Sequence, residues 1–143
     1  MTAQRQTVLV VDNAPENVAI LAAALGDMAR VRVATSGERA LTICRSAEPP
    51  DLVLLDVVMP GLDGYAVCEQ LQTDAKTQSI PVIFVSGNAG REDEERCYRA
   101  GGVDVVPKPV DIAQVRRRVA THLELVALRR QVAALQATLS GHG

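Results

Sequence analysis

The sequence predicts an α/β fold built on a doubly wound, five-stranded parallel sheet, and three observations support this prediction. Five short apolar runs recur along the chain, the pattern of strands buried on both faces of a parallel sheet. A predicted helix follows each run, and most of these helices carry apolar residues at helical spacing. Gly, Pro, Asp, Asn or Ser stands at the junctions. Strands that alternate with helices in this way form parallel sheets covered on both faces. The expected strands are residues 7–11, 31–34, 51–56, 80–85 and 103–106.

Several helices have recognisable beginnings. Pro15 followed by Glu16 is typical of a first helical turn, and Asp63 is the expected N-cap of the third helix. The segment Arg91 to Arg99 is rich in charge and has a weak apolar stripe, which predicts a loosely held surface helix. Residues 31–34 alternate between apolar and polar, so we expect this strand to lie near an edge of the sheet.

Composition limits the classes of function. A chain of 143 residues predicts one domain with a real core, and aromatic residues make up only 2%, so Val, Leu, Ile and Ala must fill that core. The net charge is −2 and no large basic block occurs, which gives no reason to expect a nucleic-acid partner. The cluster from Arg116 to Arg118 is interpreted as a solvated helix face.

The cysteines and the N-terminus predict the compartment. Cys44, Cys68 and Cys97 form no CxxC pair and both histidines lie late in the chain, so a Cys/His metal cluster is not expected. Buried free thiols in a reducing cytosol are the simpler interpretation. No signal peptide and no run of transmembrane length occurs. We therefore expect a cytoplasmic protein without a membrane partner.

Four polar side chains stand where four of the predicted strands end: Asp12, Asp56, Ser86 and Lys108. These ends share one edge of a doubly wound sheet, so residues remote in sequence converge there. Two carboxylates suit Mg²⁺, and a lysine with a hydroxyl can hold phosphoryl oxygens. Taken singly, each residue could be a helix cap, a turn former or an exposed loop residue. Taken together, they favour a site for aspartyl phosphorylation.

Six segments in chain order carry a closer likeness: residues 8–12, 15–17, 55–64, 81–86, 101–104 and 108–109. With them the sequence resembles the receiver (REC) domains of two-component response regulators over residues 6–122. The resemblance implies a flavodoxin-like sheet with strand order 2-1-3-4-5. It also implies a phosphoprotein of bacterial-type phosphorelay signalling rather than an enzyme.

The resemblance further implies a role for each site residue. Asp56 is the phosphoacceptor and takes a phosphoryl group from a histidine kinase or a phosphotransfer protein. Asp12 and Asp56, with the backbone carbonyl of Val58, hold Mg²⁺. Ser86 bonds a phosphoryl oxygen, and Lys108 pairs with the phosphoryl group.

Two positions depart from the family pattern. Asn13 stands where the family has a second acid, so we expect it to be a weak metal ligand and Mg²⁺ binding to be reduced. Val105 replaces a common Tyr or Phe, so an aromatic switch cannot operate here. These departures support an alternative, a degenerate receiver that acts as a phosphorylation-independent dimerisation or protein-interaction module.

Residues 123–143 predict a helical extension and a possible coiled coil. Ile112, Val115 and Val119 are expected to pack on the sheet, whereas later apolar residues follow the three-four spacing of a coiled-coil seam. Glu124 and Arg129 can pair between parallel helices, so we expect a homodimer through this helix. A helix that folds back or frays is the alternative. The seam residues are Leu125, Leu128, Val132, Leu135 and Leu139.

The extension leaves open whether this is a stand-alone receiver or part of a longer regulator. Extended last helices in the family often lead into an output domain, and the sequence contains none. Two other classes fit less well. An aspartyl phosphatase needs a second acid two residues after Asp56, where Val58 stands, and a nucleotide-binding module needs a glycine-rich loop after the first strand.

Overall fold

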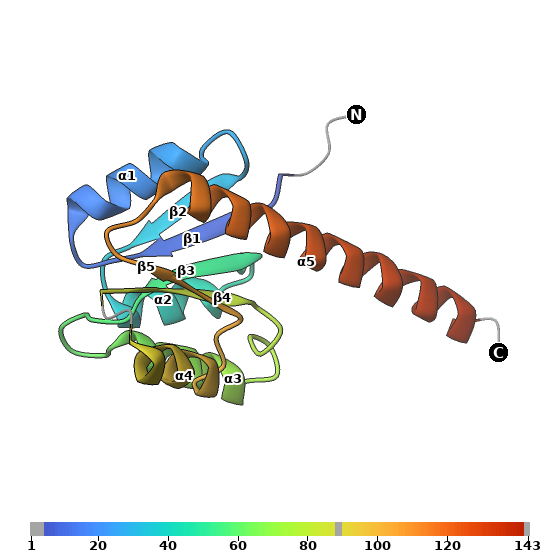
Figure 1. Ribbon diagram of the computed structural model, residues 1–143. Helices are drawn as coiled ribbons and strands as arrows, with labels where there is room; N and C mark the ends of the chain where they lie inside the picture. Colours follow the sequence, from blue (N-terminus) through green and yellow to red (C-terminus); the bar gives the residue numbers. More distant parts are fainter. Residues whose placement is uncertain (1–4, 88–89, 142–143) are drawn as a thin grey trace.

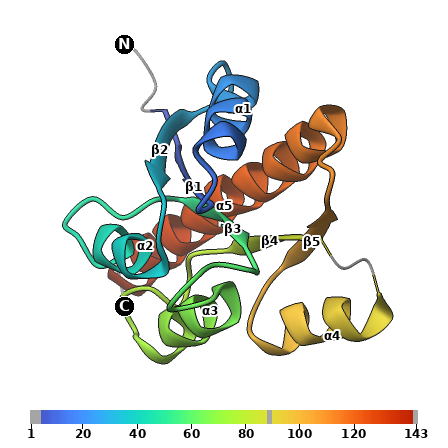
Figure 2. The same ribbon diagram turned by 90° about the vertical axis from the view of Figure 1, so that its left-hand side faces the viewer.

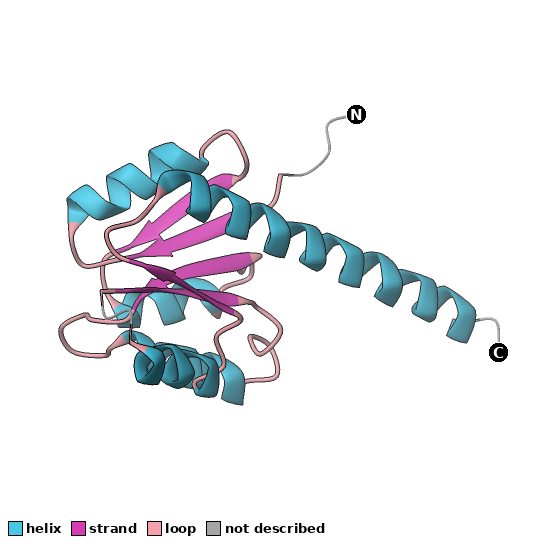
Figure 3. Ribbon diagram, in the orientation of Figure 1, coloured by secondary structure: helices cyan, strands magenta, loops and turns pink. Residues whose placement is uncertain are grey.

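The structure is a computed structural model that describes residues 5–87 and 90–141 (Figure 1). Five strands alternate with five helices along this described part of the chain, as Figure 3 shows by colour. The bounds are β1 Thr7–Val11, α1 Pro15–Leu25, β2 Arg30–Ala34, α2 Gly37–Cys44, β3 Leu52–Asp56, α3 Gly64–Thr73, β4 Val82–Ser86, α4 Arg91–Arg99, β5 Asp104–Pro107 and α5 Ile112–Gly141.

All five strands pair in parallel, in the order β2-β1-β3-β4-β5. This confirms the predicted doubly wound sheet with the flavodoxin-like order 2-1-3-4-5. Strand β2 lies at the edge, as its alternating sequence predicted, whereas β3 and β4 are buried along their whole length.

Two apolar cores lie on opposite faces of the sheet, because successive side chains of a strand point to opposite sides. In β1, for example, Leu9 and Val11 belong to one core, and Val8 and Val10 to the other. Helices α2, α3 and α4 cover the first face, and α1 and α5 cover the second, a layering visible in Figure 2. Each carboxyl end of a strand therefore opens at the same edge, between the two helical layers.

Helix α3 begins as predicted. The Asp63 side chain accepts a hydrogen bond from the Ala66 backbone N–H at 2.9 Å, which satisfies a donor that the first helical turn would otherwise leave unpaired. Helix α4 lacks such a side-chain cap at Gly90, and within α4 itself Cys97 is the buried residue. The prediction of a loosely packed surface helix at 91–99 is confirmed.

Helix α5 packs on the domain with one face and then continues past it (Figure 1). Val115 and Val119 are fully buried, as predicted, and burial continues through Leu123 to Val126. The prediction for Ile112 is wrong, since this side chain is 36% exposed. Ile112 is the first residue of the helix and lies at the edge of the core, where it borders a surface groove.

The interpretation of residues 116–118 as a solvated face holds for Arg117, which is exposed, whereas Arg116 and Arg118 each pair with a carboxylate of another element. The Arg116 guanidinium donates to both carboxylate oxygens of Asp27, at 2.7 and 3.1 Å, and so links α5 to the end of α1. Further along, Arg130 pairs with Asp51, which precedes β3. Sequence spacing alone could not reveal these partners, because they come from distant elements.

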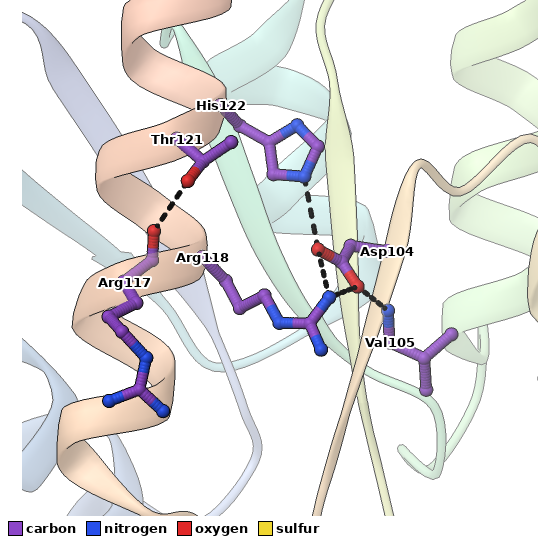
Figure 4. Close-up of polar contacts among 6 residues, drawn as sticks. All are labelled: Asp104, Val105, Arg117, Arg118, Thr121 and His122. Carbon is purple, nitrogen blue, oxygen red and sulfur yellow. Dashed lines mark hydrogen bonds and ion pairs between the residues drawn. The ribbon is translucent and has the colours of Figure 1, made fainter.

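Arg118 makes a similar link to the sheet, shown in Figure 4. Its guanidinium donates to both oxygens of the buried Asp104 carboxylate, at 2.9 and 3.1 Å, and the His122 ring lies 3.1 Å from that carboxylate. Arg117, between them in sequence, points away from this cluster (Figure 4). Ion pairs from Arg116, Arg118 and Arg130 thus join α5 to three separate parts of the domain.

Among the described residues, no helix combines the length and the apolar character that a membrane crossing requires.

Candidate functional site

The carboxyl edge of the sheet gathers the polar residues that the sequence singled out. Asp12 directly follows β1, Asp56 is the last residue of β3, and Ser86 is the last residue of β4. Lys108 directly follows β5. Since β1 and β4 flank β3, and β5 pairs with β4, the fold brings these four strand ends to one place.

Lys108 lies between the two carboxylates. Its ammonium nitrogen is 3.0 Å from Asp56 Oδ1 and 3.7 Å from Asp12 Oδ2. Both aspartates are almost fully buried. Two buried anions side by side would be costly without a cation, so the lysine compensates for their charge.

The environment of Asp56 opposes its ionisation. Burial raises the pKa of the Asp56 carboxyl above its ordinary value, the hydrogen bond from Lys108 lowers that pKa, and the nearby Asp12 carboxylate raises it. The rise prevails. The geometry therefore holds a buried carboxylate beside one cation and one other anion.

Asp12 has its own set of donors. Its Oδ1 accepts from the Ala14 backbone N–H at 2.9 Å, and its Oδ2 lies 3.3 Å from the Asn17 side-chain amide. Asn17, in the first turn of α1, is a residue whose contribution to the site the sequence analysis missed. The signal in the sequence was the spacing of Asn17 from Asp12. The first turn of the helix that follows β1 lies over the residue just after that strand.

The turn after Asp56 depends on two glycines. Gly61 has φ of +76°, in the left-handed region that favours glycine. At Gly64, a Cβ atom would lie 2.3 Å from the Asp56 carbonyl oxygen, so α3 can begin against this turn only without a side chain. Within the turn, the Val58 backbone N–H donates to Asp56 Oδ1 at 3.3 Å, while the Val58 side chain is 70% exposed.

The remaining predicted residues lie close by. Ser86 is buried at the end of β4, and its carbonyl oxygen accepts a hydrogen bond from the Lys108 backbone N–H at 2.8 Å. Asn13 is exposed beside Asp12. Val105, where the resemblance leads one to expect an aromatic ring, is half-buried and packs on the core covered by α2, α3 and α4.

The donor set agrees with a hard divalent cation. Over residues 5–87 and 90–141, no three His, Cys, Asp or Glu side chains are grouped as metal ligands. Asp12 and Asp56 supply two carboxylates at one edge, and Val58 offers a backbone carbonyl in the adjoining turn. Mg²⁺ is commonly held by one or two carboxylates and keeps several waters, so these residues fit it.

The family pattern described as "Response regulator receiver domain" matches residues 8–120 of the chain. The chain belongs to this family. Receiver domains are signalling domains of two-component systems; they interact with histidine kinases or phosphotransfer proteins and generally bind Mg²⁺ at the phosphorylation site.

Known proteins show the same relationship. The chain is 44% identical over 118 residues to the "Probable cyclic di-GMP phosphodiesterase" of Vibrio cholerae serotype O1, covering 82% of the chain and 26% of that protein. It is 36% identical over 132 residues to the "Response regulator PleD" of Caulobacter vibrioides, covering 89% of the chain and 29% of that protein. The chain thus spans less than a third of either relative.

Solved structures agree. A putative response regulator from Chloroflexus aurantiacus superposes with a TM-score of 0.79 at 29% identity, covering 85% of this chain and 99% of that one. The identification as a receiver domain is confirmed.

Proposed function

We propose that Asp56 accepts a phosphoryl group from a phosphohistidine of a sensor histidine kinase or phosphotransfer protein, in a Mg²⁺-dependent reaction. The observation that carries this proposal is Lys108, placed between two buried carboxylates at the carboxyl edge of the sheet. One oxygen of Asp56 attacks phosphorus, the O–P bond forms as the P–N bond breaks, and the imidazole leaves with the electron pair and takes up a proton.

The residues around Asp56 have separate tasks in this reaction. Lys108 neutralises charge on the phosphoryl oxygens, and the Ser86 hydroxyl donates to one of them. The raised pKa of Asp56 leaves the nucleophile less ionised in acid, so transfer should fall as pH decreases.

The proposed Mg²⁺ ligands are Asp12, Asp56 and the Val58 carbonyl, with Asn13 as a weak contributor. When Mg²⁺ is bound, its charge offsets the negative charge that gathers on the transferred group. Asn13 supplies an amide oxygen without a charge, which supports weaker binding than a second acid would give.

A groove beside the site supports docking of the phosphohistidine donor. It has a volume of about 310 Å³, reaches Asp12 and Lys108, and is bordered by Ile20 and Ile112, which are 51% and 36% exposed. An apolar side chain of the donor would bind in it and hold the phosphohistidine near Asp56. This also accounts for the exposure of Ile112.

The exposed seam of α5 supports a homodimer through this helix. At 100° per residue, Leu125, Val132 and Leu139 lie roughly 115°, 135° and 155° around the helix from the mean direction of the buried face. The seam therefore points away from its own domain, and its exposure rises from 37% at Leu125 to 74% at Leu139. Two helices pairing along it would leave both domains outside the contact, and only a parallel pair joins Glu124 to Arg129.

The dimer is testable by sedimentation of the full chain. Val132→Glu should give monomers, whereas Ala137→Glu, on the side of α5 that faces the domain, should leave the dimer intact. Truncation is better placed after Val126 than at residue 122, because Leu123 and Val126 are buried on the domain. A monomeric parent chain would contradict the dimer. The division into a receiver at 6–122 and an extension at 123–143 stays a prediction.

The phosphoacceptor role is tested by labelling with a small phosphodonor and Mg²⁺. The parent chain should gain one acid-stable, base-labile acyl phosphate, and Asp56→Ala should gain none. The second candidate is the degenerate receiver, favoured by Asn13 and Val105. It would be supported by a parent chain that takes no label at any Mg²⁺ concentration yet still dimerises.

A further inference from the structure

Tyr65 occupies a position that the phosphoacceptor chemistry leaves unexplained. It is the second residue of α3 and is 6% exposed. Its neighbour Gly64 donates its backbone N–H to the Val57 carbonyl at 2.9 Å and lies against the Asp56 carbonyl. A shift of the turn behind Asp56 must therefore move the first residues of α3, Tyr65 among them.

The Tyr65 side chain reaches across to the next helix. Its ring lies 5.6 Å from the Phe84 ring of β4, at an interplanar angle of 42°. The Arg96 guanidinium stacks over it, with Cζ 4.1 Å from the ring centroid, and the Tyr65 hydroxyl hydrogen-bonds the Cys97 side chain. Burial raises the pKa of Tyr65 to about 12, so this hydroxyl keeps its proton at neutral pH.

Helix α4 has few buried side chains. Of its nine residues, 91–99, Cys97 is the one that is buried, and Ala100 follows just beyond the helix. Its first turn carries three acids and no side-chain cap. The contact of Arg96 with Tyr65 therefore adds to the packing of Cys97 and Ala100 in the core that α2, α3 and α4 cover. In Figure 2, α4 lies beside α3 at the margin of the molecule.

We propose that Tyr65 is a positioning residue that couples the turn behind Asp56 to helix α4, through Arg96 and Cys97. This rests on the proposed function, since phosphorylation of Asp56 is the event that would move the turn. It supplies a route to α4 in a chain whose residue 105 is valine and has no ring to swing. Loosening or shifting the first turn of α3 would move the Tyr65 ring on which the Arg96 guanidinium stacks.

The first test measures amide exchange across residues 91–99 in the full chain, with and without beryllofluoride and Mg²⁺ as the phosphoryl analogue. Tyr65→Leu and Arg96→Ala should speed exchange of α4 in the unloaded protein by roughly two- to fivefold, the range of a partly exposed cation–π contact. Arg99→Ala removes the same charge from the same helix and should leave exchange unchanged. Equal effects of Arg96→Ala and Arg99→Ala would overturn the proposal.

Coupling is measured by the response to loading. In the parent chain, beryllofluoride should change exchange in α4; in Tyr65→Leu that change should be lost although small-phosphodonor labelling of Asp56 persists. If Tyr65→Leu is labelled normally and beryllofluoride still changes amide exchange in α4, the coupling is contradicted. A parent that takes no label refutes the proposed function instead.

The coupling can be tested without loading, by moving the turn directly. Gly64→Ala places a Cβ against the Asp56 carbonyl and should alter α4 exchange in the parent background. In a Tyr65→Leu background the same change should have no further effect, whereas additive effects would refute the coupling. If Gly64→Ala fails to fold, the beryllofluoride comparison decides; if beryllofluoride fails to bind, the glycine variant decides.

Discussion

Replacing Lys108 by methionine removes the cation that lies between two buried carboxylates. The side chains of Asp56 and Asp12 are 4% and 3% exposed, while that of Lys108 is 30% exposed. Breaking a buried ion pair by removing one partner costs about 3–5 kcal/mol, and the partial exposure of Lys108 places this case near the lower end, at about 3 kcal/mol. Methionine keeps most of the volume, so the loss is one of charge rather than packing.

The sign of the pH dependence follows from the carboxylates. Without Lys108 the pKa of Asp56, already raised, rises further. A carboxyl whose pKa is higher in the folded than in the unfolded state adds to the free energy of unfolding at low pH. That contribution is lost as the pH rises through the folded-state pKa. The loss in unfolding free energy caused by Lys108→Met should therefore be largest near pH 8 and shrink as the pH falls toward 4.

Urea unfolding in EDTA at several pH values measures this deficit. Lys76→Met is the matched control, since Lys76 is the only other lysine of the chain and is exposed; it should leave the unfolding free energy unchanged. A deficit for Lys108→Met that is below about 1 kcal/mol, or that does not vary with pH, would refute the charge-compensation reasoning.

Three further predictions concern the site and α5. Asp56→Asn removes a buried carboxyl whose pKa is raised, so it should increase the free energy of unfolding at pH 7 while abolishing labelling; a decrease in urea midpoint would contradict this. Asn13→Asp should tighten Mg²⁺ binding roughly tenfold in calorimetric titration, because it adds a carboxylate near the ion, and an unchanged affinity would remove the charge argument. Arg118→Met should lower stability by about 1 kcal/mol, as one of several donors to buried Asp104, whereas Arg117→Met should have no measurable effect.

Local patterns predicted the sheet and most of its helices. Buried strands such as β3 are continuous apolar runs, and β2 alternates because it lies at an edge, so both could be read from periodicity. The convergence of Asp12, Asp56 and Lys108 also follows from topology, since parallel strands end at one edge. These features depend on neighbours in sequence or on the fold class alone.

Contacts between distant surface side chains could not be predicted in the same way. Arg116 and Arg118 lie on one helix two residues apart, yet one binds Asp27 near α1 and the other binds Asp104 of β5. Ile112 has the spacing of a core residue and lies at the border of a groove. The contact of Tyr65 with Arg96 depends on how α3 and α4 are packed, which the sequence pattern does not specify.

The three cysteines give the chain a set of internal reporters. Each of α2, α3 and α4 carries one thiol, Cys44, Cys68 and Cys97, and all three are buried in the same core. Burial raises the pKa of Cys44 to about 11 and that of Cys68 to about 12, so few thiolates exist at neutral pH while the helices stay closed. Alkylation of each thiol therefore requires its helix to open, and mass mapping of the products would time the opening of three helices in one unmodified protein.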